Sequence, residues 1–241
     1  MAKGPAMTQG TVPAQCEVGN GVTRDQVAQG NRLFVTGDMG IANTAASSDL
    51  ISVFTGLDVA EVTGRGTGMD DAMLEHKVSV IETAIRVNAA SPQDPIGALA
   101  GVGGLEHAGV VGYLLAAAAM RTPVILDGVI ACSAALVAQA LAPQSADYLV
   151  EGHPAVQPGA PAALPHPCSL LPHSHRPRHP PGTHRPAPAN LSSSRRSSQA
   201  APSDGGGHAR DLRPWPSRLA VQLMQTATAN SLAPTAPPPP N

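Results

Sequence analysis

Glycine-rich segments that follow apolar runs hold the residue types suited to phosphate chemistry in this 241-residue chain. The first segment, residues 37–44, reads Gly-Asp-Met-Gly-Ile-Ala-Asn-Thr and follows the apolar run 33–36. Glycines let backbone amides approach an anion at the start of a helix. A purely structural tight turn is the alternative interpretation, because the lysine of a GxxxxGK[ST] loop is missing. The binding candidates in this segment are Asp38, Gly40, Ile41, Asn43 and Thr44.

Two further positions could serve the same ligand. Residues 64–68 read Gly-Arg-Gly-Thr-Gly and offer backbone donors, a cation and a following helix, or else a simple turn with a solvated arginine. Asp127 stands where the apolar run 124–126 ends, a position at which a carboxylate either orients a hydroxyl-rich ligand or caps a helix. The candidates added here are Gly64, Arg65, Gly66, Thr67, Gly68 and Asp127.

Other polar residues are given structural interpretations. Glu106 follows Gly-Val-Gly-Gly at a helix start, where the helix dipole favours a negative charge without any functional demand. His76 and His107 are single histidines on predicted helices, which we interpret as surface or satisfied side chains. The three cysteines lie more than 30 residues apart, so neither a zinc site nor a disulfide framework is predicted, and we expect no metal and no cofactor.

The elements that must position these residues alternate between strand and helix. Strands are predicted at 33–36, 124–126 and 148–150, and helices between about 44 and 54, after Asp70, after 101–104 and after Gly128. The helix after Asp70 carries an apolar stripe, with Lys77 on its other face. Apolar strands that alternate with helices indicate an α/β fold with a parallel sheet flanked by helices, in a Rossmann-like three-layer arrangement. Ligands of such sheets bind at the carboxyl ends of the strands.

Composition divides the chain at residue 152. The segment 153–241 holds 19 of the 25 prolines and seven of the nine histidines, and its net charge is +6 against −8 for residues 1–152. Proline removes backbone donors, and few aliphatic side chains are present to offset the entropy of ordering. We therefore expect a loose N-terminal lead-in at 1–30, an α/β core at 31–152, and a low-complexity, disordered tail at 153–241. No apolar stretch is long enough to cross a bilayer and no signal pattern opens the chain, so we expect no membrane partner and a cytoplasmic location.

Four segments in order resemble one enzyme family. They are GDMGIANT, EVTGRGTGMDDAMLEHKVSVI, the run from GVGGLEHAG to AQALAP, and DYLVEGH, and together they span about residues 30–153. With GPAMT at residues 4–8 they are similar to the core of nicotinate-nucleotide:dimethylbenzimidazole phosphoribosyltransferases. Such an enzyme is a pentosyltransferase of cobalamin lower-ligand synthesis. It moves phosphoribose from nicotinate mononucleotide to 5,6-dimethylbenzimidazole, which gives α-ribazole 5′-phosphate and nicotinate.

The resemblance also implies a homodimer, and it implies that the two glycine segments and Asp127 contact the phosphoribosyl group. The chain departs from the family pattern at several points. Asp38 stands where the family usually has glutamate, the N-terminal part that helps enclose the benzimidazole is absent, and the family's catalytic glutamate has no counterpart in 153–241. The family pattern GHRSAEPGH is also broken after His153, at Pro154, Ala155, Gln157 and Ala160. We therefore expect impaired catalysis and assign no catalytic residue.

Two other functions are kept as alternatives. A non-catalytic nucleotide-binding or regulatory module would use the core for a nucleotide and the basic tail for an acidic partner. Recognition of nucleic acid is not expected, because Trp215 is the one aromatic residue of the tail available for stacking. A dinucleotide-dependent oxidoreductase is a weaker alternative, since no acidic residue stands at the spacing of a Rossmann fingerprint.

Overall fold

Four short parallel strands and seven α-helices make up most of the part of the chain that the computed structural model describes, which is residues 1–38, 40–66, 68–152 and 169–170. The strands are β1 (Phe34–Val35), β2 (Val124–Leu126), β3 (Leu149–Glu151) and β4 (Ser169–Leu170). They form one sheet in the order β1-β2-β3-β4. Phe34 pairs with Val124, Val124 with Leu149, and Val150 with Ser169.

The helices begin and end where local chemistry favours it. They are α1 (Thr11–Ala28), α2 (Thr44–Thr55), α3 (Val59–Val62), α4 (Asp71–Val87), α5 (Pro95–Val102), α6 (Leu105–Ala119) and α7 (Gly128–Leu141), followed by a 3₁₀ turn, η1 (Pro143–Tyr148). The side chain of Asp70 caps α4 by accepting from the Met73 amide, and that of Asp94 caps α5 by accepting from the Gly97 amide. Gly56 ends α2 in the left-handed conformation.

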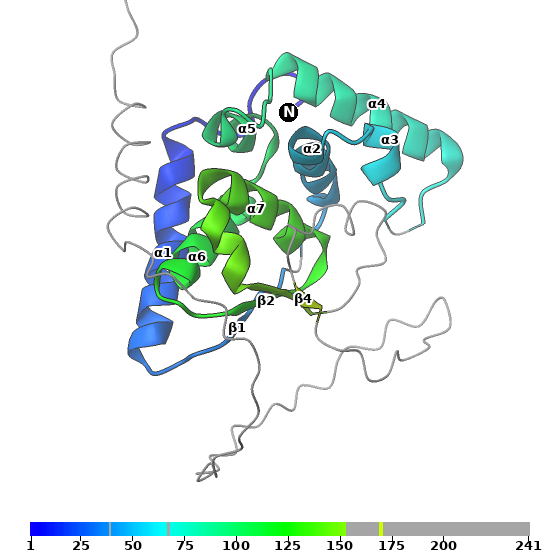
Figure 1. Cartoon of the computed structure of the whole chain (residues 1–241). Coiled ribbons are helices and arrows are strands. Elements are labelled where there is room, and N and C mark those ends of the chain that lie inside the picture. Colours follow the sequence, from blue (N-terminus) through cyan, green and yellow to red (C-terminus); the bar gives the residue numbers. More distant parts are fainter. Residues whose placement is uncertain (39, 67, 153–168, 171–241) are drawn as a thin grey trace, which may run out of the picture. The chain divides into compact units, whose positions relative to one another are not determined.

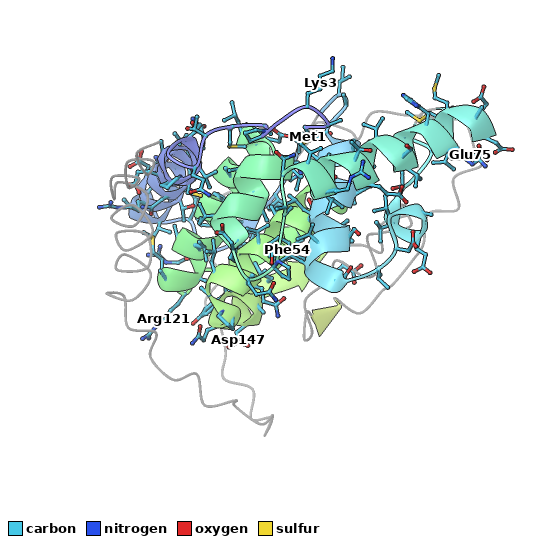
Figure 2. All side chains as sticks on the ribbon, turned by 90° about the horizontal axis from the view of Figure 1, so that it is seen from above. Met1, Lys3, Phe54, Glu75, Arg121 and Asp147 are labelled. Atoms are coloured by element: carbon cyan, nitrogen blue, oxygen red, sulfur yellow. The ribbon has the colours of Figure 1, made fainter. Side chains whose placement is uncertain are left out.

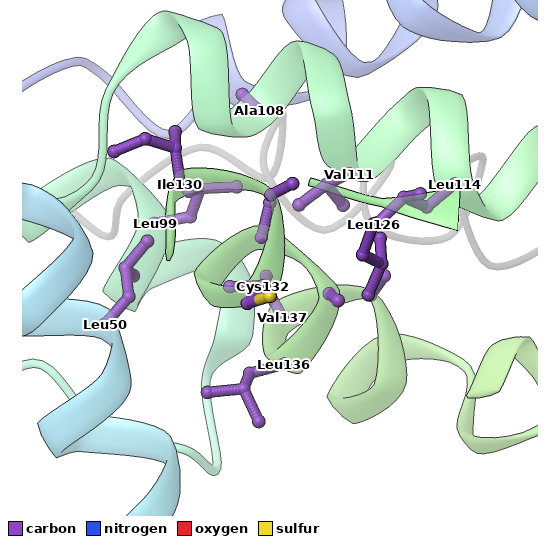
Figure 3. Packing of buried hydrophobic residues seen from close by; sticks show 14 of the residues in the cluster. Leu50, Leu99, Ala108, Val111, Leu114, Leu126, Ile130, Cys132, Leu136 and Val137 are labelled. Atoms are coloured by element: carbon purple, nitrogen blue, oxygen red, sulfur yellow. The ribbon is translucent and has the colours of Figure 1, made fainter. Parts of the chain in front are cut away.

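Helix α7 packs against both α2 and α6, and the core lies among these helices (Figure 1). Leu50 of α2, Leu114 of α6 and Val137 of α7 are fully buried and belong to the same core cluster as Leu126 of β2 (Figure 3). The core relies on aliphatic side chains and alanine, and its one ring contact among the described residues joins Phe34 to Tyr113 at 5.4 Å between centroids. A parallel sheet with helices packed on it confirms the predicted fold class. No helix in the described part of the chain combines the length and apolar character needed to cross a membrane.

The expected loose lead-in at residues 1–30 is wrong, because α1 occupies 18 of those residues. The buried face of α1 consists of Val12, Cys16, Gly19 and Thr23, which follow a helical spacing of i, i+4, i+7 and i+11. Only the first of these is a large aliphatic residue, so the stripe is weak as a hydropathy signal. The predicted strand at 148–150 is shifted by one residue in β3.

The expected disorder from 153 to 241 is wrong at residues 169 and 170. These two residues form β4, paired in parallel with Val150 and Glu151. Ser169 and Leu170 lie in a stretch without proline between Pro167 and Pro172, so their backbone amides can join a sheet edge. The rest of the predicted tail lies outside the described residues.

Candidate functional site

The first glycine segment leaves β1 and turns back into α2. Asn43 Nδ2 donates a hydrogen bond of 2.7 Å to Asp38 Oδ2, which ties the two ends of the turn together. A Cβ at residue 40 would lie 1.7 Å from Asn43 Nδ2, so any other residue there would displace the Asn43 side chain from its present position. Ala42 takes a positive φ of 69°, a conformation that is unfavourable for any residue with a Cβ. Ile41 is 96% exposed at the tip of the turn.

Because the Asn43 side chain is engaged with Asp38, it does not cap α2. The first amides of an α-helix have no intrahelical acceptor, and here the N-cap side chain supplies none. The start of α2 therefore presents backbone donors and the positive end of the helix dipole. Thr44, the first residue of α2, adds a hydroxyl group at the same place.

The second glycine segment precedes α4. Gly66 and Gly68 both have positive φ, as a turn of this shape requires. Arg65 forms an ion pair with Asp71 and donates to the Met69 carbonyl oxygen at 3.3 Å. The guanidinium that the sequence offered as a ligand for an anion is thus paired with the first residue of α4. Thr67, another candidate, lies outside the described residues.

Lys77 joins the two glycine segments. Its Nζ donates to Thr44 Oγ1 at 3.2 Å and to the carbonyl oxygen of Gly64 at 3.0 Å. Burial lowers the pKa of Lys77. The periodicity of α4 placed this lysine on the face opposite the apolar stripe, yet the side chain is half-buried, whereas Glu75 on the same helix points outward (Figure 2). No sequence signal identified Lys77, because its partners lie 33 and 13 residues away in the chain.

Asp127 lies at the same end of the sheet as the first turn. Its amide donates to Thr36 Oγ1 at 2.8 Å, and the Thr36 amide donates to the Ile125 carbonyl oxygen at 2.9 Å. These bonds join the carboxyl ends of β1 and β2, and Asp38 follows Thr36 by two residues. Asp127 occupies the N-cap position of α7, although its side chain makes no capping hydrogen bond there.

A set of three polar side chains connects α6 with α2. Ser47 Oγ lies 3.0 Å from His107 Nε2, and Glu106 Oε1 lies 3.1 Å from His107 Nδ1. The pKa of Glu106 is lowered, above all by the His107 side chain. His107 is fully buried and its Nε2 is hydrogen-bonded to Ser47, but its Nδ1 has no hydrogen-bond partner within the described part of the chain, so the interpretation as a satisfied histidine holds for one ring nitrogen only. Glu106 does not cap α6 through its side chain. Sequence reasoning did not connect Ser47 to either residue.

Within the described ranges, no three His, Cys, Asp or Glu side chains gather as a metal ion would require. What does gather is a lysine, a helix start without a side-chain cap and, at the end of the sheet, the turn that holds Asp38. Such a set of donors suits an anionic group, and neighbouring carboxylates suit hydroxyl groups attached to it.

Comparison with known proteins agrees with this chemistry. A phosphoribosyltransferase family model matches residues 1–166, a longer stretch than the motifs at 30–153 had suggested. A nicotinate-nucleotide–dimethylbenzimidazole phosphoribosyltransferase of Salinispora tropica is 50% identical over 159 residues, which are 66% of this chain and 44% of that protein. The enzyme of the same name from Desulforudis audaxviator is 47% identical over 166 residues, 69% of this chain and 47% of that one.

Solved structures show the same relationship. The crystal structure of CobT from Thermus thermophilus has a TM-score of 0.64 and 34% identity, and the match covers 71% of this chain and 51% of that one. The chain spans about half the length of the relatives and structures that it matches. The chain belongs to the family of nicotinate-nucleotide–dimethylbenzimidazole phosphoribosyltransferases.

Proposed function

We propose that this chain binds nicotinate mononucleotide at the two glycine segments and transfers its phosphoribosyl group to 5,6-dimethylbenzimidazole. The products would be α-ribazole 5′-phosphate and nicotinate. The observation that carries this proposal is the Lys77 bridge between Thr44 and Gly64, beside a start of α2 that the Asn43 side chain leaves uncapped. A phosphate placed there would meet a cation, a hydroxyl group and free amides.

The sugar would lie toward the end of the sheet. Asp38 follows β1 and Asp127 follows β2, so their carboxylates stand on the side where the strands end. Carboxylates there accept hydrogen bonds from ribose hydroxyls, and negative charge stabilises the electron-poor C1 carbon as nicotinate leaves. Gly40, Ile41, Asn43 and the residues 64–68 complete the proposed contacts.

The transfer breaks the bond between C1 and the nicotinate nitrogen, forms a bond between C1 and a benzimidazole nitrogen, and releases one proton. In the family pattern a glutamate near the C-terminus takes this proton, and residues 153–241 contain no such motif. Loss of a general base lowers the rate by about 10²- to 10⁴-fold. We therefore propose that donor binding is retained and turnover is slow.

The donor site is tested by the substitution Lys77→Met. We expect it to weaken binding of nicotinate mononucleotide, measured by calorimetry, by about 10- to 100-fold, the usual effect of losing a hydrogen bond to a charged group. Lys3→Met is the control, because Lys3 is exposed and points away from the N-terminal segment (Figure 2). Equal affinity of the Lys77→Met protein and wild type would contradict the proposed site.

Turnover is tested separately by incubating the protein with both substrates and separating α-ribazole 5′-phosphate by chromatography. Slow product formation with tight donor binding would agree with the proposal, whereas normal turnover would show that another group takes the proton. Binding of the nucleotide without any product would favour the alternative function, a non-catalytic nucleotide-binding module with a basic tail. A salt-dependent gel shift with RNA tests the expected absence of nucleic-acid binding.

The resemblance also supports a homodimer acting in the cytoplasm, and we include both in the proposal. Sedimentation of the purified chain tests the first. Fractionation of cells that produce it tests the second.

A further inference from the structure

A chain of polar side chains runs from the surface of α6 to the first turn of α2. Glu106 is the outer member, with 34% of its side chain exposed, and His107 and Ser47 are fully buried. The Ser47 hydroxyl also donates to the carbonyl oxygen of Asn43, at 3.2 Å. The four groups therefore connect a half-exposed carboxylate to the backbone of the candidate phosphate turn.

The proton positions on these four groups follow from what each of them can donate or accept. A carboxylate only accepts, so we assign a proton to the Nδ1 atom that faces Glu106. The contact is close but poorly aligned, which leaves Nδ1 without a well-formed hydrogen bond among the described residues. The attraction between the Glu106 carboxylate and a proton on Nδ1 depends chiefly on distance, and Oε1 and Nδ1 lie 3.1 Å apart.

The hydroxyl group of Ser47 has one proton and two acceptors within reach. When His107 is neutral, its Nε2 accepts the hydroxyl proton of Ser47, and the Asn43 carbonyl oxygen then receives no hydrogen bond from that hydroxyl group. When His107 is an imidazolium, its Nε2 donates to Ser47 Oγ, and the hydroxyl proton turns to Asn43. The hydrogen bond that Asn43 receives from Ser47 is therefore set by the state of the Glu106–His107 pair.

Asn43 is the residue through which this state reaches the turn. Its side chain holds Asp38, and its peptide carbonyl begins α2 by accepting from the Ser47 amide. Serine, histidine and an acid in this order also occur as nucleophilic triads. Here the hydroxyl lies buried inside a helix turn, where no substrate carbonyl can reach it, so a positioning role fits the geometry.

We propose that Glu106, His107 and Ser47 are positioning residues that orient the Asn43 peptide and, through it, the turn from Asp38 to Thr44. The proposal rests on the function proposed above insofar as this turn holds the phosphoribosyl donor. We call Glu106, His107, Ser47 and the Asn43 carbonyl the relay. It joins the N-terminal end of α2 to the N-terminal end of α6, and Ser47 and His107 are 60 residues apart in sequence.

The test is a double-substitution cycle read by NMR on the full-length protein. As a single substitution, Glu106→Gln removes the carboxylate charge beside His107 Nδ1, and we expect it to shift the carbonyl ¹³C resonance of Asn43. In a Ser47→Ala background the same change should leave that resonance in place. Ser133→Ala is the matched control, since Ser133 is equally buried and its hydroxyl donates to Ile130 of its own helix. In this control background, the shift caused by Glu106→Gln should match the wild-type shift.

The relay would be overturned if Glu106→Gln shifted the Asn43 resonance equally with and without the Ser47 hydroxyl group. It would also be overturned if the single substitution Glu106→Gln caused no shift. A measurement without any variant is the ring ¹⁵N spectrum of His107, in which Nδ1 should be protonated. Protonation of Nε2 alone would contradict the proposed order of donors.

Donor affinity provides a separate readout. Ser47→Ala should weaken binding of nicotinate mononucleotide by about 2- to 10-fold, as expected for one neutral hydrogen bond, and Ser133→Ala should not. Wild-type protein that fails to bind the nucleotide would overturn the proposed function, while the resonance shifts would still decide whether the relay exists. Unchanged affinity in the Ser47→Ala protein would overturn the role of the relay in donor binding.

Discussion

Asp49 is the most unusual single residue of the described structure. It lies in the middle of α2, it has no exposed surface, and neither carboxylate oxygen has a hydrogen-bond partner within the described part of the chain. Burial raises the pKa of Asp49 to about 8. An acid in this state is protonated when the protein is folded at neutral pH and ionised when the chain is unfolded.

Asp49 should therefore make the stability of the protein depend on pH. Its pKa is raised on folding, so the free energy of unfolding is highest below the unfolded pKa of about 4 and falls as the pH rises toward 8. We expect Asp49→Asn to remove a slope on the order of 1 kcal/mol per pH unit between these limits. Chemical denaturation at pH 5, 6.5 and 8 measures this slope.

Glu75→Gln is the control for Asp49→Asn, because Glu75 is an exposed carboxylate on α4 (Figure 2). It should leave the pH dependence as in wild type. If the Asp49→Asn protein lost stability with pH as steeply as wild type does, Asp49 would not be the group that titrates.

At the scale of elements, the closest packing joins α1 to α6. A Cβ on Gly112 would lie 1.9 Å from the Cys16 carbonyl oxygen, and one on Gly19 would lie 1.9 Å from the Gly109 carbonyl oxygen. The two backbones touch because each helix places a glycine against the other. Such contact positions α6, and with it the Glu106–His107 pair, against the rest of the core.

Gly112→Ala should separate these helices. We expect a loss of about 1–3 kcal/mol in the free energy of unfolding, the usual result of adding a methyl group where no space exists. Gly109→Ala in the same helix is the matched control, since a Cβ there meets no atom within 4 Å. It should raise stability by about 0.5–1 kcal/mol through helix propensity alone. Thermal and urea unfolding measure both variants, and a Gly112→Ala protein as stable as Gly109→Ala would show that α1 and α6 can separate without loss.

At the scale of the whole molecule, the family match ends at residue 166 and the described elements end with β4 at residue 170. Residues beyond that point carry many prolines and few large aliphatic side chains. Such a composition supplies little apolar surface to bury. We therefore expect residues 172–241 to contribute little to the stability of the described elements.

Truncation after Leu171 should leave the melting temperature within about 2 °C of the full-length value, a change that corresponds to less than about 1 kcal/mol in a chain of this size. Calorimetry and far-UV circular dichroism provide the comparison. Loss of cooperative unfolding in the shortened chain would show that residues 172–241 take part in the fold. A chain of the same length with Leu126→Ala is the matched destabilised reference, because Leu126 is buried in β2.

The sequence by itself determined the fold class and the elements with strong patterns. The apolar runs at β1 and β2 and the stripe of α4 were readable because large aliphatic residues repeat at the period of the element. Helix α1 was not readable, since Cys16, Gly19 and Thr23 line its buried face, and a glycine that permits close packing contributes no hydropathy signal. Local pattern reports which face is apolar and is silent about how closely two backbones approach.

Some residues of the candidate site could also be identified from the sequence, and others only from the tertiary structure. The glycine turns and Asp127 could be identified from the sequence, because turn residues after apolar runs are local features of the chain. Only the tertiary structure decided that Lys77 joins Thr44 to Gly64, that Arg65 is held by Asp71, and that Ser47 meets His107. Most of these partners lie far apart in sequence. The packing of α2 against α4, and of both α2 and α6 against α7, sets the distances that make them partners.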